Sequence, residues 1–219
     1  MCINTPLRRI ALALPLALVA FAAQSGPLPF DNNWKEQGFL RLWSNEYTLS
    51  GSHLDVVSDG TVSLLYRAVP KELWDADHAA WRWAVRQSVI ATDLSVKGGD
   101  DRNLAIYFVF VDRGSAEKLS QRSARRLLRN RNTRALAYVW GGDYAPGQIL
   151  TSPYGDGILK TVIARPSSTG EFAESIDLAS DFARAFGEER GVLIGIGITA
   201  DSDDTDGKIV ARISDLVVE

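Results

Sequence analysis

The run from Leu104 to Val111 is apolar at every position and constrains the fold more than any other stretch of the chain. In an extended strand, successive side chains point to opposite faces of a sheet. The even and odd positions therefore form two apolar faces, made of Leu104, Ile106, Phe108 and Phe110 and of Ala105, Tyr107, Val109 and Val111. We expect this run to be a central strand that is covered on both sides, since solvent-facing strands alternate in polarity.

Other short stretches are rich in β-branched and aromatic residues and end at turn pairs such as Asp59–Gly60, Gly98–Gly99, Asp156–Gly157 and Asp206–Gly207. They predict strands over Gly38 to Leu42, His53 to Val57, Val62 to Ala68, Ala80 to Val85, Ala135 to Trp140, Leu159 to Ala164, Val192 to Thr199 and Ile209 to Val218. Many short strands without a strand–helix alternation predict an all-β fold with minor helices, namely a β-sandwich or jelly roll.

Two segments have helical spacing of apolar residues. One helix is expected over Ser115 to Asn130, with Ser115 as its cap, and another over Ile176 to Phe186, ending at Gly187. Within the predicted strand Ala80 to Val85, Trp81 and Trp83 share a face with Val85. This row is typical of a buried core, and a sugar-stacking platform is the alternative interpretation.

The N-terminus has the three parts of a secretory signal. Arg8 and Arg9 precede the apolar run Ile10 to Phe21, and small residues near Ala22 fit a cleavage site. The apolar run is too short for a membrane-spanning helix and contains Pro15. We therefore predict a cleaved signal peptide over residues 1–22, a single β-sandwich domain over residues 23–219, and no transmembrane anchor after cleavage. The expected location is periplasmic or extracellular.

Composition excludes several classes of partner and site. The only cysteine is Cys2, so the mature domain has neither disulfides nor cysteine catalysis. Asp and Glu outnumber Lys and Arg by 27 to 24, and loss of Arg8 and Arg9 makes the mature domain more acidic, which argues against a nucleic-acid partner. Six arginines nevertheless gather between Arg122 and Arg134. The solvated face of a helix is the favoured interpretation, and a site for an anionic partner is the alternative.

Aspartates are the remaining candidates for chemistry, because His53 and His78 are the only histidines and neither lies in a recognisable nucleophile motif. Asp100 and Asp101 precede the central strand, Tyr154 and Asp156 lie in a turn, and Asp201 and Asp203 follow an apolar strand. Loops at the rim of a rigid sheet are frequent binding sites, although aspartates also populate turns for local hydrogen bonding. A glycosidase pair from Asp100 or Asp101 with Asp156 or Asp201 requires these loops to converge.

Asp201 and Asp203 have the one-and-three spacing of a calcium loop. The match to an EF-hand then fails, because Asp206 stands at the glycine position and Arg212 at the glutamate position. An irregular calcium site built on Asp201 and Asp203 remains open, and no other cofactor is expected.

A series of short motifs resembles a bacterial family of domains of unknown function, number 3047, from about Trp34 to Val218. The motifs are Leu65–Tyr66–Arg67, Trp81–Arg82–Trp83–Ala84–Val85, Gly99–Asp100–Asp101, Ile106–Tyr107–Phe108–Val109–Phe110, Tyr138–Val139–Trp140–Gly141, Pro153–Tyr154–Gly155–Asp156, Ala185–Phe186–Gly187–Glu188 and Thr199–Ala200–Asp201–Ser202–Asp203–Asp204–Thr205. The resemblance implies an exported protein and a jelly roll similar to galactose-binding-like carbohydrate-binding modules. The chain departs from the family pattern at Ala84, Gly155 and Ser214, where lysine, threonine and glycine are common.

Three functions remain open at this point. A non-catalytic module that binds a glycan or polar small molecule is favoured, with the candidate ligand-binding residues Arg67, Arg82, Asp100, Asp101, Tyr107, Trp140, Tyr154 and Asp156. The second is a glycan-acting enzyme that uses aspartate carboxylates. The third is a structural or assembly protein of the cell envelope, whose arginine-rich helix binds an acidic partner.

Overall fold

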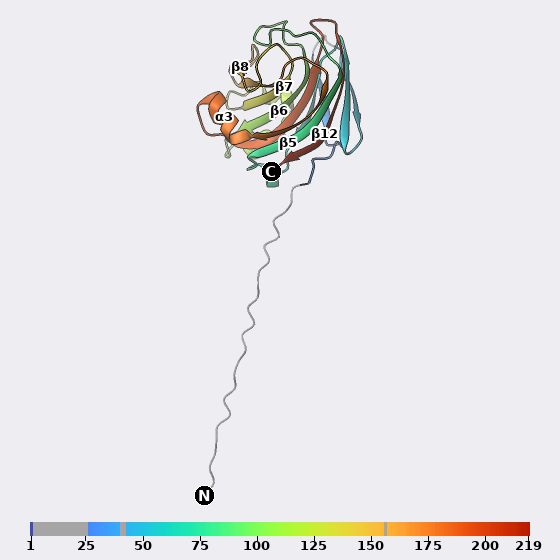
Figure 1. Cartoon of the computed structure of the whole chain (residues 1–219). Coiled ribbons are helices and arrows are strands. Elements are labelled where there is room, and N and C mark those ends of the chain that lie inside the picture. The colour runs from blue at the N-terminus through green and yellow to red at the C-terminus, as the bar shows by residue number, and fades with distance from the viewer. Residues whose placement is uncertain (2–25, 40–42, 156) are drawn as a thin grey trace.

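The computed structural model describes residues 1, 26–39, 43–155 and 157–219, and shows two β-sheets packed face to face (Figure 1). In spatial order the seven-stranded sheet contains β1 (Lys35–Gly38), β4 (Ser63–Ala68), β11 (Val192–Asp201), β6 (Arg102–Val111), β7 (Arg134–Trp140), β9 (Leu159–Arg165) and β8 (Ile149–Thr151). The five-stranded sheet contains β10 (Gly170–Asp177), β5 (His78–Gln87), β12 (Lys208–Val218), β3 (His53–Asp59) and β2 (Glu46–Leu49). The predicted β-sandwich is confirmed.

The core between the two sheets is built on aromatic side chains. Trp81 and Trp83 on β5 are 2% and 1% exposed. The Trp81 ring lies 6.1 Å from that of Phe108 on β6, and the Trp83 ring lies 5.5 Å from that of Trp140 on β7. The prediction that both tryptophans belong to the core is therefore confirmed.

Strand β6 lies in the middle of the seven-stranded sheet, between β11 and β7, as its all-apolar sequence predicts. From Leu104 to Phe110 its even-numbered side chains are fully buried in the core, whereas Ala105, Tyr107 and Val109 lie on the outer face of the sheet. Ala105 is covered there by a small cluster around Leu94, but Tyr107 stays partly exposed. The outer face of β6 is thus only partly covered, and the open part becomes the floor of a pocket.

The helices are short. Besides the 3-10 turn η1 (Lys71–Leu73), the described residues form α1 (Ala116–Ser120), α2 (Ala124–Leu127) and α3 (Leu178–Phe186). The expected single helix over Ser115 to Asn130 is wrong, because Ser123 is extended and separates α1 from α2. Ser115 occupies the cap position of α1 without a side-chain hydrogen bond, whereas α3 ends at a left-handed Gly187 as predicted.

Three strands escaped prediction from the sequence. Strands β2, β8 and β10 lie at sheet edges and are largely exposed, so they lack the apolar alternation that marks a half-buried strand. The strand expected over Gly38 to Leu42 extends beyond the described residues, which place β1 at Lys35–Gly38 instead. Residues 2–22 of the predicted signal peptide also lie outside the described residues. No helix in the described part of the chain has the length and apolarity needed to cross a membrane.

Candidate functional site

A pocket of about 350 Å³ lies on the outer face of the seven-stranded sheet. Its floor comes from β4, β11, β6, β7 and β9, and its walls come from Leu94, from α2 and from the turn Ser152–Tyr154. Most lining side chains are aliphatic or aromatic, and the charged groups gather at one end. This combination of an apolar cavity and a few converging polar groups is typical of small-ligand sites.

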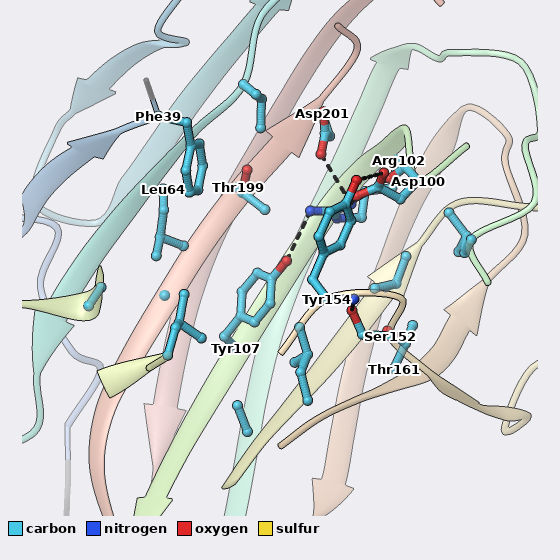
Figure 2. Close-up of a pocket in the computed structure, with 18 of the residues that line it drawn as sticks. Phe39, Leu64, Asp100, Arg102, Tyr107, Ser152, Tyr154, Thr161, Thr199 and Asp201 are labelled. Atoms are coloured by element: carbon cyan, nitrogen blue, oxygen red, sulfur yellow. Dashed lines mark hydrogen bonds and ion pairs between the residues drawn. The ribbon is translucent and has the colours of Figure 1, made fainter. Parts of the chain in front are cut away.

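Arg102 organises the polar end of the pocket (Figure 2). Its Nη1 lies 3.2 Å from Oδ2 of Asp100 and 3.1 Å from Oδ2 of Asp201, while its Nη2 donates to the Tyr107 hydroxyl at 3.0 Å. These contacts follow from the sheet register, which pairs Arg102 at the start of β6 with Asp201 at the end of β11. The guanidinium side chain is only 13% exposed, so these partners replace water around its charge.

Asp201 is a buried carboxyl that retains its proton. Burial raises its pKa to about 9, against the opposing effect of Arg102, and the neighbouring Asp203 and Asp100 carboxylates add to the rise. Its Oδ1 atom is buried and has no hydrogen-bond partner among the residues that the structure describes. A proton on Asp201 adds a hydrogen-bond donor to this end of the pocket and leaves the Arg102 charge balanced by Asp100.

Two partly exposed aromatic side chains flank the pocket. The Tyr154 hydroxyl donates to Oδ1 of Asp100 at 3.1 Å, and Lys97 lies over its ring. Burial, together with the Asp100 carboxylate, raises the Tyr154 pKa to about 12, so this hydroxyl stays protonated. Phe39 lines the pocket as well, and both rings remain about two-fifths exposed, at 41% for Phe39 and 44% for Tyr154.

Asp101 holds the loop after β11 against the start of β6. Its fully buried carboxylate accepts from the backbone amides of Thr205 at 2.8 Å and Asp204 at 3.2 Å. This contact places Asp203 and Asp204 at the pocket, so Asp101 is a positioning residue rather than a lining residue.

The predicted calcium ligands lie in the same region. Asp101, Asp201 and Asp203 each offer a carboxylate oxygen within 4.8 Å of the others. Arg102, however, already contacts Asp201, and Asp101 is engaged by the backbone. Calcium prefers six to eight oxygen ligands, and calcium binding here stays a prediction from the sequence.

The structure brings together some of the predicted site residues. Asp100, Tyr107 and Tyr154 line the pocket, with Asp201 and Asp203 from the predicted metal loop. Convergence of the loops before β6 and after β11, which the carboxylate hypothesis requires, is therefore present. Asp156 lies outside the described residues.

Three other predicted residues lie away from the pocket. Arg67 points toward the N-terminal segment, where its Nη1 donates to the Pro29 carbonyl at 2.8 Å. Arg82 projects from the outer face of the five-stranded sheet toward Glu171 at 3.6 Å. Trp140 is fully buried in the core and donates to Ser168. These three side chains therefore do not share a site with Asp100.

Sequence reasoning missed Arg102. The sequence did contain a signal for it, because Arg102 directly follows Asp100 and Asp101 and precedes an apolar run. At this position the strand holds the arginine charge beside its acidic partners. The smaller polar groups Ser152, Thr161 and Thr199 were also missed. Each lies on a different element, so only the fold brings them together.

The arginine-rich segment is mostly solvent-facing, as its favoured interpretation predicts, although it is not one helix. Four of its six arginines are exposed, namely Arg125, Arg126, Arg129 and Arg131. Among the described residues, Arg134 is the arginine of this segment that forms an ion pair, with Glu188 at 3.0 Å. Ala124, Leu127 and Leu128 of the same segment turn the other way and line the pocket.

The fold and the site together define a β-sandwich protein with an acidic-ended pocket on the outer face of one sheet. The chain belongs to the family described as "Protein of unknown function (DUF3047)", whose model matches residues 32–217. This match confirms the resemblance seen in the sequence motifs. No curated protein matches the chain.

Several solved structures are similar in outline. The xyloglucanase domain of NopAA, a type three effector from Sinorhizobium fredii, has a TM-score of 0.47 and 8% identity, over 90% of this chain and 96% of that one. A loop-swap mutant of the Neocallimastix patriciarum xylanase Xyn11A has a TM-score of 0.44 and 14% identity, over 90% and 97% of the two chains. The family 11 xylanase from the same organism has a TM-score of 0.41 and 13% identity, over 85% and 99%. At these TM-scores the likeness assigns neither an activity nor a ligand to this chain.

Proposed function

We propose that this chain is a glycan-binding domain whose pocket holds one or a few sugar residues. The observation that carries the proposal is the polar end of the pocket, where Asp100, Asp201 and Asp203 converge around Arg102 beside the half-exposed ring of Tyr154. Sugar hydroxyls both donate and accept, and this end offers both acceptor carboxylates and a protonated carboxyl. Aromatic rings such as Tyr154 and Phe39 supply flat apolar surfaces for sugar C–H groups.

The charge of the polar end argues against anionic ligands. Asp100, Asp201, Asp203 and Asp204 line this end together with a single arginine, which already contacts Asp100 and Asp201. A phosphate or carboxylate entering this end meets uncompensated carboxylates at low dielectric constant. Neutral hydroxyl-rich ligands avoid this repulsion. The size of the pocket, at the lower end of the range for small-ligand sites, also favours a short glycan over a long polymer chain.

Binding is tested by thermal melting of the mature domain against a panel of mono- and oligosaccharides. A ligand at about 100 times its dissociation constant stabilises the folded state by about 2.7 kcal/mol, which raises the melting temperature by roughly 5 to 10 °C. Asp100→Asn and Tyr154→Ala should each weaken binding at least tenfold. Glu72→Gln, an exposed carboxylate outside the pocket, is the matched control and should bind normally. Equal binding by all three variants would place the ligand elsewhere.

Hydrolysis of a glycan is the second candidate function. It is favoured by one observation: the pocket holds a carboxyl with a raised pKa, Asp201, beside Asp100, which pairs with Arg102. Carboxyl groups in different protonation states are what general acid–base catalysis needs. Release of reducing ends from a polysaccharide panel, abolished by Asp201→Asn, supports this activity. Binding without any release leaves the chain a binding domain.

A further inference from the structure

The polarity of the pocket changes along its length. Strand β6 contributes Arg102 at one end of the floor, Tyr107 in the middle and Val109 toward the other end. At about 3.3 Å per residue, the stretch from Arg102 to Val109 covers roughly 23 Å. Figure 2 shows Asp100, Arg102, Asp201 and Tyr154 gathered near one another, with Tyr107 reaching toward them from along its strand. The pocket is therefore long enough to hold two chemically different parts of one ligand.

The end of the pocket beyond Tyr107 is mostly apolar, and the hydroxyl of Tyr66, which lies beside Gly195 on β11, is a polar group at this end. The sheet register places Val109 beside Ala135 of β7, and Ala135 beside Leu159 of β9. The remaining lining at this end comes from α2 and the residue that follows it, through Ala124, Leu127 and Leu128. A sugar bound here finds the Tyr66 hydroxyl but leaves most of its own hydroxyls without partners, which costs free energy.

We infer that the ligand of this pocket is an amphipathic glycoside, with its sugar against Asp100 and Asp203 and an alkyl or acyl chain along Val109, Ala135 and Leu127. This inference rests on the proposed glycan-binding function and names the class of glycan. The match is one of complementary polarity at both ends. A bare fatty acid fits less well, because its carboxylate would meet the acidic end or be buried among aliphatic side chains.

The test compares methyl and n-octyl glycosides of glucose, galactose and mannose, by calorimetric titration below the micelle concentration. Each methylene buried in an apolar site tightens binding about fourfold. We expect the octyl compound of at least one sugar to bind the wild-type chain at least a hundredfold more tightly than its methyl counterpart. Octanol at the same concentration should not bind with the affinity of that octyl glycoside, because it lacks the sugar.

A pair of variants locates the chain-binding end. Leu128→Asp puts a charge into the apolar end at a half-buried position, and should remove most of the octyl preference, measured as the ratio of octyl to methyl affinity for each sugar. Arg125→Asp places the same charge on the exposed side of α2 and should leave the preference intact. The circular dichroism spectrum of both variants verifies the fold.

The outcomes separate the two proposals. Equal affinity for methyl and octyl glycosides overturns the amphipathic ligand and leaves glycan binding standing. Octanol that binds as tightly as the octyl glycosides overturns the role of the sugar. No binding by any of the six glycosides overturns this inference, and if the saccharide panel is also silent, the proposed function falls with it. A preference for the octyl compounds that Leu128→Asp does not reduce places the chain outside this pocket and overturns the assignment.

Discussion

Arg102 lies mostly buried between the Asp100 carboxylate and the protonated carboxyl of Asp201, so its substitution tests the site at the level of one residue. Arg102→Met removes the cation and leaves Asp100 buried without its charge partner. Breaking a buried ion pair costs about 3–5 kcal/mol in the free energy of unfolding. The measurement is urea denaturation of the wild-type and variant chains.

The matched control is Arg82→Met on the other sheet. Arg82 also lies near a carboxylate, that of Glu171, but more than half of its side chain is exposed. Exposed pairs contribute about 0–1 kcal/mol. Similar losses in the two variants would mean that Arg102 is not the buried centre described above.

The Asp201 carboxyl makes the folded chain sensitive to pH. Its pKa is about 9 in the folded state and near 3.8 when unfolded, so the folded state binds the additional proton between these values. Stability from this proton is complete at acidic pH and is lost as pH rises toward 9. Asp201→Asn carries no titrating group, so its urea midpoint should fall less than that of the wild type between pH 5 and pH 9. Urea midpoints that change equally with pH in the wild type and in Asp201→Asn would contradict the raised pKa.

At the scale of single residues, the sequence analysis identified the acidic residues of the site and missed its cation, Arg102. Asp100, Tyr154 and Asp201 were accessible because aspartates and aromatic residues in rim loops are recognisable candidates. Arg67 and Arg82 were chosen by residue type, but only the strand pairing decides which face and which end of a sheet a side chain reaches. The role of Arg102 depends on the register between β6 and β11, two strands that are far apart in the sequence.

Helix α3 is the element whose end signals are clearest. Oδ1 of Asp177 accepts from the Ser180 amide at 2.8 Å, and Gly187 ends the helix in the left-handed conformation. Asp177→Ala removes the capping hydrogen bond and should cost about 1 kcal/mol of stability, measured as a lower urea midpoint. Asp143→Ala, at an exposed position outside the helices, should change the midpoint little. Equal effects would show that the cap contributes nothing.

Strands and helices were predictable from the sequence where burial imposes a regular spacing of apolar residues. Strands β5, β6 and β11 carry the apolar rows of the core and were predicted, whereas β10 is an exposed edge strand whose Glu171, Glu174 and Ser175 make it resemble a loop in sequence. The expected long helix failed for a different reason. Its apolar residues have helical spacing, but the chain breaks at Ser123, and α2 then turns Leu127 into the pocket.

At the scale of the whole molecule, we propose that the chain is exported and loses its first residues. Expression of the full chain in a bacterial host should yield a periplasmic or secreted protein whose N-terminal sequence begins at Ala23 or Gln24. Leu14→Arg interrupts the apolar run and should keep the protein in the cytoplasm at full length. An exported protein that still begins at Met1 would contradict cleavage.

The strand order of the two sheets also sets when folding can occur. Strand β12 lies between β5 and β3, and β11 lies between β4 and β6, so the last two strands in chain order fill the middle of both sheets. Synthesis proceeds at about 5–20 residues per second. Until residues 192–218 have left the ribosome, each sheet lacks one of its inner strands, and the core around Trp81 and Trp83 is incompletely covered. The sandwich therefore cannot be completed before β12 is available, and an incompletely folded chain is the state in which a polypeptide can be threaded through a narrow translocation channel.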